Sequence, residues 1–596
     1  MGNNRNFIIA IALSIVVLFA WQYFVAQPQI ERAQQDAANQ VAASEPLAPA
    51  GQLDGGAAVV PQIIAETREE AIGETARIPI ETPSLTGSIN LVGARIDDLS
   101  LNDYRVTIED GSPNVVLLSP ANGPGGYFAE FGWLGGAGVA APGSATVWTA
   151  PAGAVLTPET PVTLTYDNGA GLVFTRIVSV DAEYLFTVAD SVANTGEAAA
   201  TLTPYGRVTR LGEPESRGFF ILHEGMIGFL GDDGLVDVDY AVLEGEPRQD
   251  YTGAPGGWLG ITDKYWATAL IPDRDDAFSA SFRRPTEGGV RYQADYAGAA
   301  VSVAPGATAE TTNRLFAGAK EVAVVDGYDS ALGLQRFELL VDWGMFYFIT
   351  KPMFHMLDWF YRLIGNFGVA ILLVTVVIKL LFFPLANRSY RSMASMRKVG
   401  PQLTAIRERY KDDRAKQQQM MMELYRKEKI NPIAGCWPIL IQIPVFFALY
   451  KVLYVTIEMR HQPFFGWIQD LSAPDPTSFI NLFGLLPFEA PAIIMIGVWP
   501  ILMGITMWVQ MRLNPQTPGA PQWIFHLLPI VFTFMLSSFP AGLVIYWTWN
   551  NLLSIAQQSF IMRRHGVKVD LLGNIRASFR RKPKVPAAAN SDSKAK

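Results

Sequence analysis

The chain contains a single cysteine, Cys436, and only five histidines among its 596 residues. One thiol cannot form an intramolecular disulfide, so each folded domain must be held by its own core. A zinc-binding helix needs two histidines one turn apart, and His223-Glu224 has no second histidine at that spacing. The sequence also lacks a P-loop and a serine nucleophile elbow. These absences argue against an enzyme, and we expect no metal and no small-molecule cofactor.

Charge is also scarce, at 17% of residues, and it is missing from several long stretches. A membrane-spanning helix needs about 20 mostly apolar residues. Six stretches satisfy this, at residues 7–25, 367–386, 433–457, 492–511, 523–539 and 542–562. The sequence therefore predicts a polytopic α-helical membrane protein with six transmembrane helices. The first stretch forms an anchor at 1–26; a cleaved signal peptide is the alternative, although its apolar run is longer than usual.

The basic residues are concentrated in two segments. Residues 387–432 carry twelve Lys and Arg against five Asp and Glu, and residues 563–596 carry ten against two. With −8 on the whole chain, these segments leave −23 on the rest. Because Lys and Arg accumulate beside spans on the cytoplasmic side, both segments and both termini are predicted to be cytoplasmic. The large insertion between the first two spans then lies outside, in a periplasm-like compartment.

The insertion differs in composition from the helical remainder. Residues 27–78 are rich in Ala, Gln, Glu and Pro and predict a flexible linker. Residues 79–335 contain alternating segments such as those beginning at Ser88, Val162 and Val290, separated by Gly, Asp, Asn and Pro. These segments predict a large all-β sandwich. Apolar and polar residues interleave at 336–365, which predicts an amphipathic helix in the outer membrane interface.

The second apolar stretch contains a lysine, Lys379, and a cation at membrane depth costs roughly 2.5–3.5 kcal/mol. Lys379 lies about 10 Å of helix from the cytoplasmic end, so it could extend to the inner headgroups. The alternative is a polar, water-accessible groove open to the cytoplasm. Four other polar residues at comparable depth favour the groove, although spacing alone does not bring them together: Thr375, Gln442, Tyr546 and Asn550.

Aromatic residues on the other spans could form a hydrophobic surface for a passing helix, or could simply face lipid or the protein core. The candidates are Phe446, Phe447, Trp508, Phe532 and Phe534. The basic segment 387–432 has apolar positions at helical spacing, with a polar break at residues 411–414, and predicts a cytoplasmic helical hairpin. Its charges suit either anionic lipids or a docking partner.

Several segments resemble the YidC/Oxa/Alb family of membrane protein insertases, in the six-span form of Gram-negative bacteria. The most specific is NPIAGCWPILIQIPVFFALY at 431–450. Supporting segments are VDWG at 341–344, SMASMR at 392–397, FFGWIQDL at 464–471, FPAGLVIY at 539–546 and GGWLGITDKYWATALIP at 256–272.

The resemblance implies an inner-membrane insertase and chaperone with a five-helix core at 366–562, a hydrophilic groove and a periplasmic β-sandwich. Its implied partners are nascent membrane proteins, the Sec translocon with its accessory subunits, and the ribosome through the basic hairpin and the tail at 563–596. Lys379 takes the position of the family's usual groove arginine, and Trp547 stands where a second tyrosine is expected. The competing interpretation is a secondary transporter or channel that uses Lys379 to bind an anionic solute.

Overall fold

The structure is a computed structural model that describes residues 65–212, 222–286, 289–428, 437–478, 496–513 and 522–566. The chain divides into two units. Unit 1 comprises Met1–Trp343 with Val455–Glu458, and unit 2 comprises Gly344–Tyr454 with Met459–Lys596. The predicted first anchor, the linker up to residue 64, Cys436 and the tail after residue 566 lie outside the described residues.

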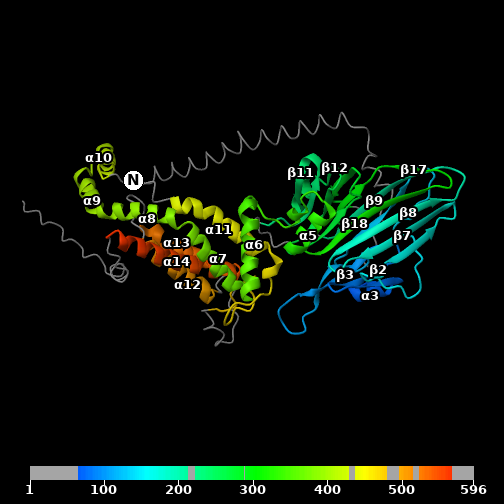
Figure 1. Cartoon of the computed structure of the whole chain (residues 1–596), viewed down its shortest axis with the longest axis horizontal. Helices are drawn as coiled ribbons and strands as arrows, with labels where there is room; N and C mark the ends of the chain where they lie inside the picture. Colours follow the sequence, from blue (N-terminus) through cyan, green and yellow to red (C-terminus); the bar gives the residue numbers. More distant parts are fainter. Residues whose placement is uncertain are drawn as a thin grey trace, which may run out of the picture. The chain divides into compact units, whose positions relative to one another are not determined.

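Unit 1 consists mainly of two antiparallel sheets (Figure 1). In spatial order, the first sheet contains β1 (Arg77–Glu81), β2 (Leu85–Asn90), β3 (Arg95–Arg105), β5 (Tyr127–Gly135), β9 (Ala200–Leu211), β16 (Arg291–Ala297), β15 (Phe278–Arg283) and β12 (Arg248–Gly253). Two further strands pair with β3 and β9, respectively: β4 (Asn114–Leu118) and β17 (Val301–Val303). The second sheet contains β11 (Gly234–Asp239), β10 (Gly225–Leu230), β13 (Trp258–Thr262), β14 (Trp266–Ile271), β18 (Thr308–Ala319), β8 (Leu185–Asn194), β7 (Leu172–Val180) and β6 (Val162–Asp167).

One hydrophobic core contains side chains from both sheets, including Phe131 and Phe282 from the first and Phe174 and Trp258 from the second. Strands in which buried residues alternate with less buried ones, such as β7, supply one face to this core. The predicted all-β sandwich is therefore confirmed.

Buried ion pairs also lie within the sandwich. Arg176 on β7 pairs with Asp190 on β8, with Nε 2.7 Å from Oδ1, and its Nη2 donates to the carbonyl oxygen of Phe131 at 2.7 Å. Arg176 thus connects the two sheets. In the first sheet, the Glu130 carboxylate lies 3.1 Å from Arg95 and 3.4 Å from Arg207. Both pairings keep buried charges compensated, without which burial would be costly.

Two details of unit 1 differ from the sequence-based expectations. The end of the predicted linker is ordered: α3 (Arg68–Gly73) begins with a capping box between Thr67 and Glu70, and β1 starts at Arg77. The predicted strand beginning at Ser88 is two strands, because the backbone turns at Gly93 and Ala94, where φ is 78° and 50°. Gly93 and Ala94 are small enough to fit an alternating strand pattern, so the pattern alone did not indicate the turn.

The predicted interfacial helix at 336–365 begins later than expected. After α5 (Val322–Leu332), a 3₁₀ turn, η4 (Phe337–Leu340), contributes Phe337 and Leu340 to the sandwich core. Positive φ values at Arg336 and Gly344, 55° and 70°, interrupt any continuous helix. The amphipathic helix itself is α6 (Tyr347–Ile364).

Unit 2 is helical. Its longer helices are α7 (Phe367–Leu381), α8 (Phe383–Lys398), α9 (Gly400–Arg409), α10 (Arg414–Lys427), α11 (Trp437–Val455), α12 (Val498–Leu513), α13 (Gln522–Met535) and α14 (Ala541–Arg564). In the described residues, no single helix combines the length and hydropathy needed to cross a membrane. Helices α7 and α8 meet that test together, but with a 66° bend between them. The six predicted transmembrane helices are thus not shown, and the predicted span at 367–386 is broken near Phe382.

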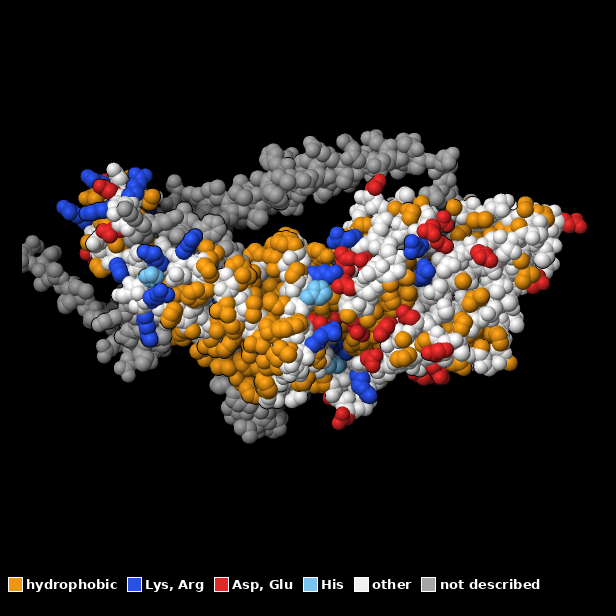
Figure 2. Space-filling view, in the orientation of Figure 1, with side chains coloured by type: hydrophobic (Ala, Val, Ile, Leu, Met, Phe, Trp, Pro, Cys, Tyr) orange, Lys and Arg blue, Asp and Glu red, His pale blue; other side chains and the backbone are white. Residues whose placement is uncertain are grey.

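The predicted hairpin is present as two helices, α9 and α10, separated at Tyr410–Asp413. Asp413 caps α10 by accepting a hydrogen bond from the Lys416 backbone at 3.0 Å. Buried Val399 and Leu403 pack with a set of partly buried side chains: Met396, Met421, Leu424 and Tyr425. Figure 2 shows Lys and Arg gathered around this hairpin, while hydrophobic side chains cover the neighbouring helices.

Candidate functional site

Helix α7 is apolar throughout most of its length, and its amino end is fixed by Asn366. The Asn366 side chain accepts a hydrogen bond from the Val369 backbone at 3.0 Å. The Trp549 indole on α14 donates to the carbonyl oxygen of Leu372 on α7 at 3.1 Å. This bond across the two helices sets their rotation, so that Lys379 is presented toward α14.

Helix α14 carries a polar stripe on one face. Tyr546, Asn550 and Ser554 follow one another at intervals of four residues, which places them on the same side of an α-helix. All three residues are buried. Buried polar groups require hydrogen-bond partners, and the neighbouring helices supply them.

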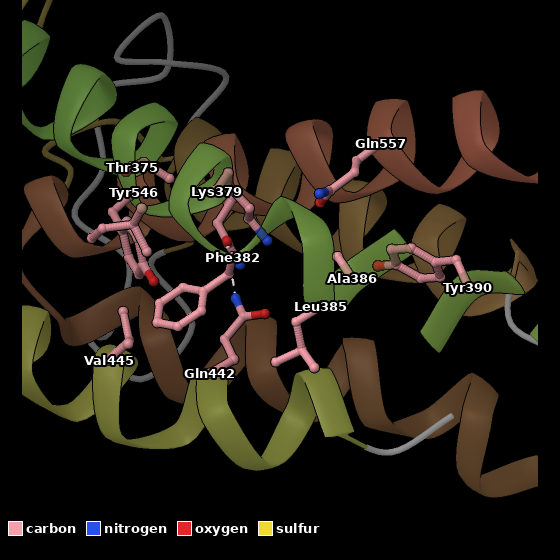
Figure 3. Close-up of a pocket in the computed structure, with 12 residues that line it drawn as sticks. Thr375, Lys379, Phe382, Leu385, Ala386, Tyr390, Gln442, Val445, Tyr546 and Gln557 are labelled. Atoms are coloured by element: carbon pink, nitrogen blue, oxygen red, sulfur yellow. Dashed lines mark hydrogen bonds between the residues drawn. The ribbon is translucent and has the colours of Figure 1, made fainter. Parts of the chain in front are cut away.

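A cavity of about 60 Å³ lies between α7, α8, α11 and α14 (Figure 3). Its volume is enough for about two water molecules. The structure brings all five predicted groove residues into its wall, which consists of Thr375, Ile378, Lys379, Phe382, Leu385, Ala386, Tyr390, Gln442, Val445, Tyr546, Asn550 and Gln557.

Lys379 is the charged residue of this wall. Its Nζ donates to Ser554 Oγ at 2.8 Å, and the Ser554 hydroxyl donates in turn to the carbonyl oxygen of Asn550 at 2.7 Å. The cavity wall contains no carboxylate within the described residues. The ammonium therefore has a polar neighbour but leaves its positive charge available to the cavity.

Two further polar residues are joined across helices. Gln442 on α11 donates through Nε2 to Asn550 Oδ1 at 2.9 Å (Figure 3). Thr375, by contrast, donates to the carbonyl oxygen of Ile371 within its own helix at 2.7 Å. Thr375 therefore shapes the wall, whereas Gln442 and Asn550 form part of a network that spans it.

The sequence reasoning missed Ser554, the hydrogen-bond partner of Lys379. Extending the stripe of Tyr546 and Asn550 by four more residues would have reached it. It also missed Gln557 and Tyr390, which line the cavity toward α8. No comparable signal marks Tyr390, because its position depends on the bend between α7 and α8.

The five aromatic residues predicted as a hydrophobic surface for a passing helix lie in different surroundings. Phe446 and Phe532 are half-buried, and each packs against Trp547, at ring-centre distances of 4.8 and 5.4 Å. Phe447 and Phe534 are 46% and 50% exposed. The fifth predicted residue, Trp508, lies on α12, where the Arg512 guanidinium is 5.1 Å from its ring.

Trp547, the unexpected residue after Tyr546, is thus the contact point between α11 and α13. The cavity beside it offers a cation, amides and hydroxyls in an otherwise apolar wall. Such a wall suits reversible hydrogen bonding to a hydrophilic peptide segment, and the aromatic residues next to it suit an apolar one.

Comparison with known proteins gives consistent matches along the chain. Residues 77–356 match the family model described as the YidC periplasmic domain, and residues 359–568 match the 60Kd inner membrane protein model. A membrane protein insertase YidC from Methylobacterium sp. strain 4-46 is 55% identical, over 99% of this chain and all of the relative. The corresponding protein of Rhizobium meliloti strain 1021 is 54% identical over 98% of this chain. A crystal structure of an active YidC insertase aligns with 84% of the chain, at 17% identity and a TM-score of 0.34.

Proposed function

The chain belongs to the YidC family of membrane protein insertases, and on this basis we propose that the cavity around Lys379 receives the hydrophilic end of a substrate during insertion. As a family member, the protein is an inner-membrane insertase with a periplasmic domain, and it acts on nascent membrane proteins. The proposal concerns the mechanism by which the protein inserts these substrates.

The observation that carries the proposal is Lys379, which donates to Ser554 and lines a cavity whose wall contains no carboxylate among the described residues. An acidic residue of a substrate tail would otherwise enter the bilayer at a cost of roughly 2.5–3.5 kcal/mol. An ammonium within the cavity offsets part of this cost. Lysine keeps the charge of the family's usual arginine but lacks the planar fork that binds carboxylates through two bonds. We therefore expect attraction with little geometric selectivity.

The apolar part of the substrate would move along α11 and α13 past Phe446, Phe447, Phe532 and Phe534, with Trp508 on α12 at the edge. Transfer into lipid contributes about 0.8 kcal/mol per buried methylene. This free energy drives the process in the proposal, without nucleotide hydrolysis or any covalent reaction.

In the proposed topology, six crossings place both termini and the α9–α10 hairpin in the cytoplasm, because Lys and Arg are concentrated there. The periplasmic sandwich would then be available to the Sec translocon and its accessory subunits. The hairpin and the basic tail would face the ribosome and anionic lipids. The relatives' designation as insertases favours this function over transport of an anionic solute.

The test is protease protection of a short single-span substrate, added to proteoliposomes that contain only this protein. Two versions of the substrate carry an acidic or a neutral tail. We expect Lys379→Glu to reduce protection of the acidic version by about tenfold, equivalent to roughly 1.4 kcal/mol. Leu380→Ala is the matched control, because Leu380 is 65% exposed and does not line the cavity. Equal insertion of both substrate versions by Lys379→Glu would contradict the electrostatic role.

A further inference from the structure

An exposed apolar stripe runs along α14 and ends in arginines. Leu552 and Phe560 are 44% and 59% exposed, and Ala556 lies between them, so these residues repeat every four positions on one side of the helix. The next residues on this side are Arg563 and Arg564, both exposed. The buried residues of the same segment, including Ser554 and Gln558, lie on the opposite side.

The end of this stripe is hollowed. An open hollow of about 590 Å³ is lined by Ala556, Ser559, Phe560, Arg563 and Arg564. Ser559 contributes a hydroxyl oxygen that is buried and has no hydrogen-bond partner in the described part of the chain. A hydroxyl in that situation is well suited to a ligand that accepts a hydrogen bond.

A further cation lies close to the residue that follows α14. Helix α14 ends at Arg564, and Gly566 follows with a φ of 75°. Lys398 Nζ lies 4.0 Å from the position that a Cβ on Gly566 would take. No ion pair involves Lys398, Arg563 or Arg564 among the residues that the structure describes. The hollow therefore combines positive charge, a free hydroxyl and an apolar stripe that leads away from it.

From this arrangement we infer that the hollow binds the headgroup phosphate of an anionic phospholipid. Arg563 and Arg564 bind the phosphate oxygens, Ser559 donates a hydrogen bond to one of them, and an acyl chain lies along Phe560, Ala556 and Leu552. Guanidinium groups bind phosphate in a planar, bidentate manner. The stripe continues away from the arginines through Ala556 and Leu552, which match an acyl chain. RNA would need further aromatic side chains for stacked bases, and Phe560 is the one aromatic residue among those that line the hollow in the described part of the chain. The inference rests on the proposed membrane topology, because it places this end of α14 at the headgroups.

The experiment is native mass spectrometry of the full-length protein, mixed with equal amounts of dioleoyl phosphatidylglycerol and dioleoyl phosphatidylcholine. We expect retained phosphatidylglycerol to exceed phosphatidylcholine by at least about fivefold. The double variant Arg563→Gln/Arg564→Gln should lose this preference, and Ser559→Ala should weaken it. Arg563→Lys/Arg564→Lys preserves the charge and should retain part of the preference, which separates a binding effect from misfolding.

The matched control is Arg248→Gln/Arg274→Gln, which removes two charges from the surface of the sandwich and should leave lipid retention unchanged. An unchanged preference in Arg563→Gln/Arg564→Gln, or equal loss in both variants, would overturn the inference. If inorganic phosphate displaced the lipid at a concentration similar to that of the lipid, the hollow would be a free-phosphate site, and this result would also overturn the inference. The inference would also be overturned if Arg563→Gln/Arg564→Gln lost co-sedimentation with ribosomes but kept its preference for phosphatidylglycerol. Lipid retention is measured without substrate, so the insertion assay on the same preparations tests the proposed function separately.

Discussion

The ammonium of Lys379 lies 2.8 Å from the hydroxyl oxygen of Ser554, and the pair joins α7 to α14 at the cavity wall. The Ser554 hydroxyl proton is already donated to the Asn550 carbonyl oxygen, so its oxygen faces the cation as an acceptor. This hydrogen bond favours a position of the Lys379 side chain beside α14.

This relationship predicts the effect of Ser554→Ala. Without its acceptor, Lys379 should become mobile, and insertion of an acidic-tailed substrate should fall by about tenfold, because a hydrogen bond to a charged group contributes roughly 1.5 kcal/mol or more. Insertion of a neutral-tailed substrate should change little. Ser538→Ala, at an exposed site, serves as the control in the same protease-protection assay. Equal losses for both substrates would show that Ser554 acts only through packing.

The Gln442–Asn550 hydrogen bond should be measurable as an energetic coupling. We expect a double-mutant cycle with Gln442→Met and Asn550→Leu to give about 0.5–1 kcal/mol, as found for other hydrogen bonds between membrane helices. Thermal unfolding of the full-length protein in detergent provides the measurement. Additive effects of the two substitutions would mean that the two side chains do not stabilise the bundle together.

The buried Arg176–Asp190 pair should be essential for the sandwich. Asp190→Asn leaves the guanidinium without its compensating charge, and removal of one partner of a buried pair costs about 3–5 kcal/mol. Hydrogen exchange of β7 and β8, followed by mass spectrometry of the full-length protein, should accelerate strongly. The exposed pair Arg248–Asp250 is the control, since Asp250→Asn should cost less than about 1 kcal/mol. If hydrogen exchange were similar in Asp190→Asn and Asp250→Asn, the Arg176–Asp190 pair would not be essential for the sandwich.

Glu130 should make the sandwich sensitive to acid. Burial alone raises the pKa of its carboxyl group, but the guanidiniums of Arg95 and Arg207 outweigh this effect, and the pKa lies below its ordinary value of 4.5. Because the folded-state pKa is the lower one, the carboxylate stabilises the fold above the unfolded pKa. This contribution is lost as pH falls through the lowered value. Glu130→Gln should be less stable at neutral pH and should show a shallower decline below about pH 4.5. Parallel pH profiles of unfolding for the two proteins would exclude this role.

The capping box of α3 should stabilise the start of unit 1. Thr67→Ala removes the hydroxyl that accepts from the Glu70 backbone at 3.2 Å, at a cost of about 1 kcal/mol. Hydrogen exchange in peptides that cover α3 should increase, whereas Thr67→Ser should behave like the original sequence. If hydrogen exchange of these peptides were unchanged in Thr67→Ala, packing of Ala71 alone would hold the helix in place.

The helical periodicity of the sequence was sufficient to identify Lys379, Thr375, Tyr546 and Asn550 as candidates. Residues four apart share a face in any α-helix, so this part of the wall does not depend on tertiary structure. The pairing of Lys379 with Ser554 was not predictable, because it depends on how α7 is rotated against α14. The assignment of these residues to substrate binding stays a prediction.

The sandwich was predicted from alternating apolar residues, and the strands β6 and β16 lie where that pattern placed them. The pattern failed for Arg176 and Asp190, since it treats every charged residue as exposed. Charges compensate each other here across neighbouring strands, which only the register between β7 and β8 reveals. The apolar run around Phe382 likewise concealed the bend, because Pro384 is compatible with the first turn of a new helix.

The early end of α7 has an electrostatic consequence for Lys379, which lies in the last turn of that helix. Aligned peptide dipoles leave roughly half a negative elementary charge at the carboxyl end of a helix. Had the helix continued unbent to Ala386, those unsatisfied carbonyl groups would lie more than one turn further along. Ending the helix at Leu381 instead brings this negative end close to Lys379, but α8 begins at Phe383 with the positive end of its own dipole. The two helix ends therefore offset each other beside Lys379, and the bend leaves the positive charge of the ammonium for an incoming acidic residue to compensate.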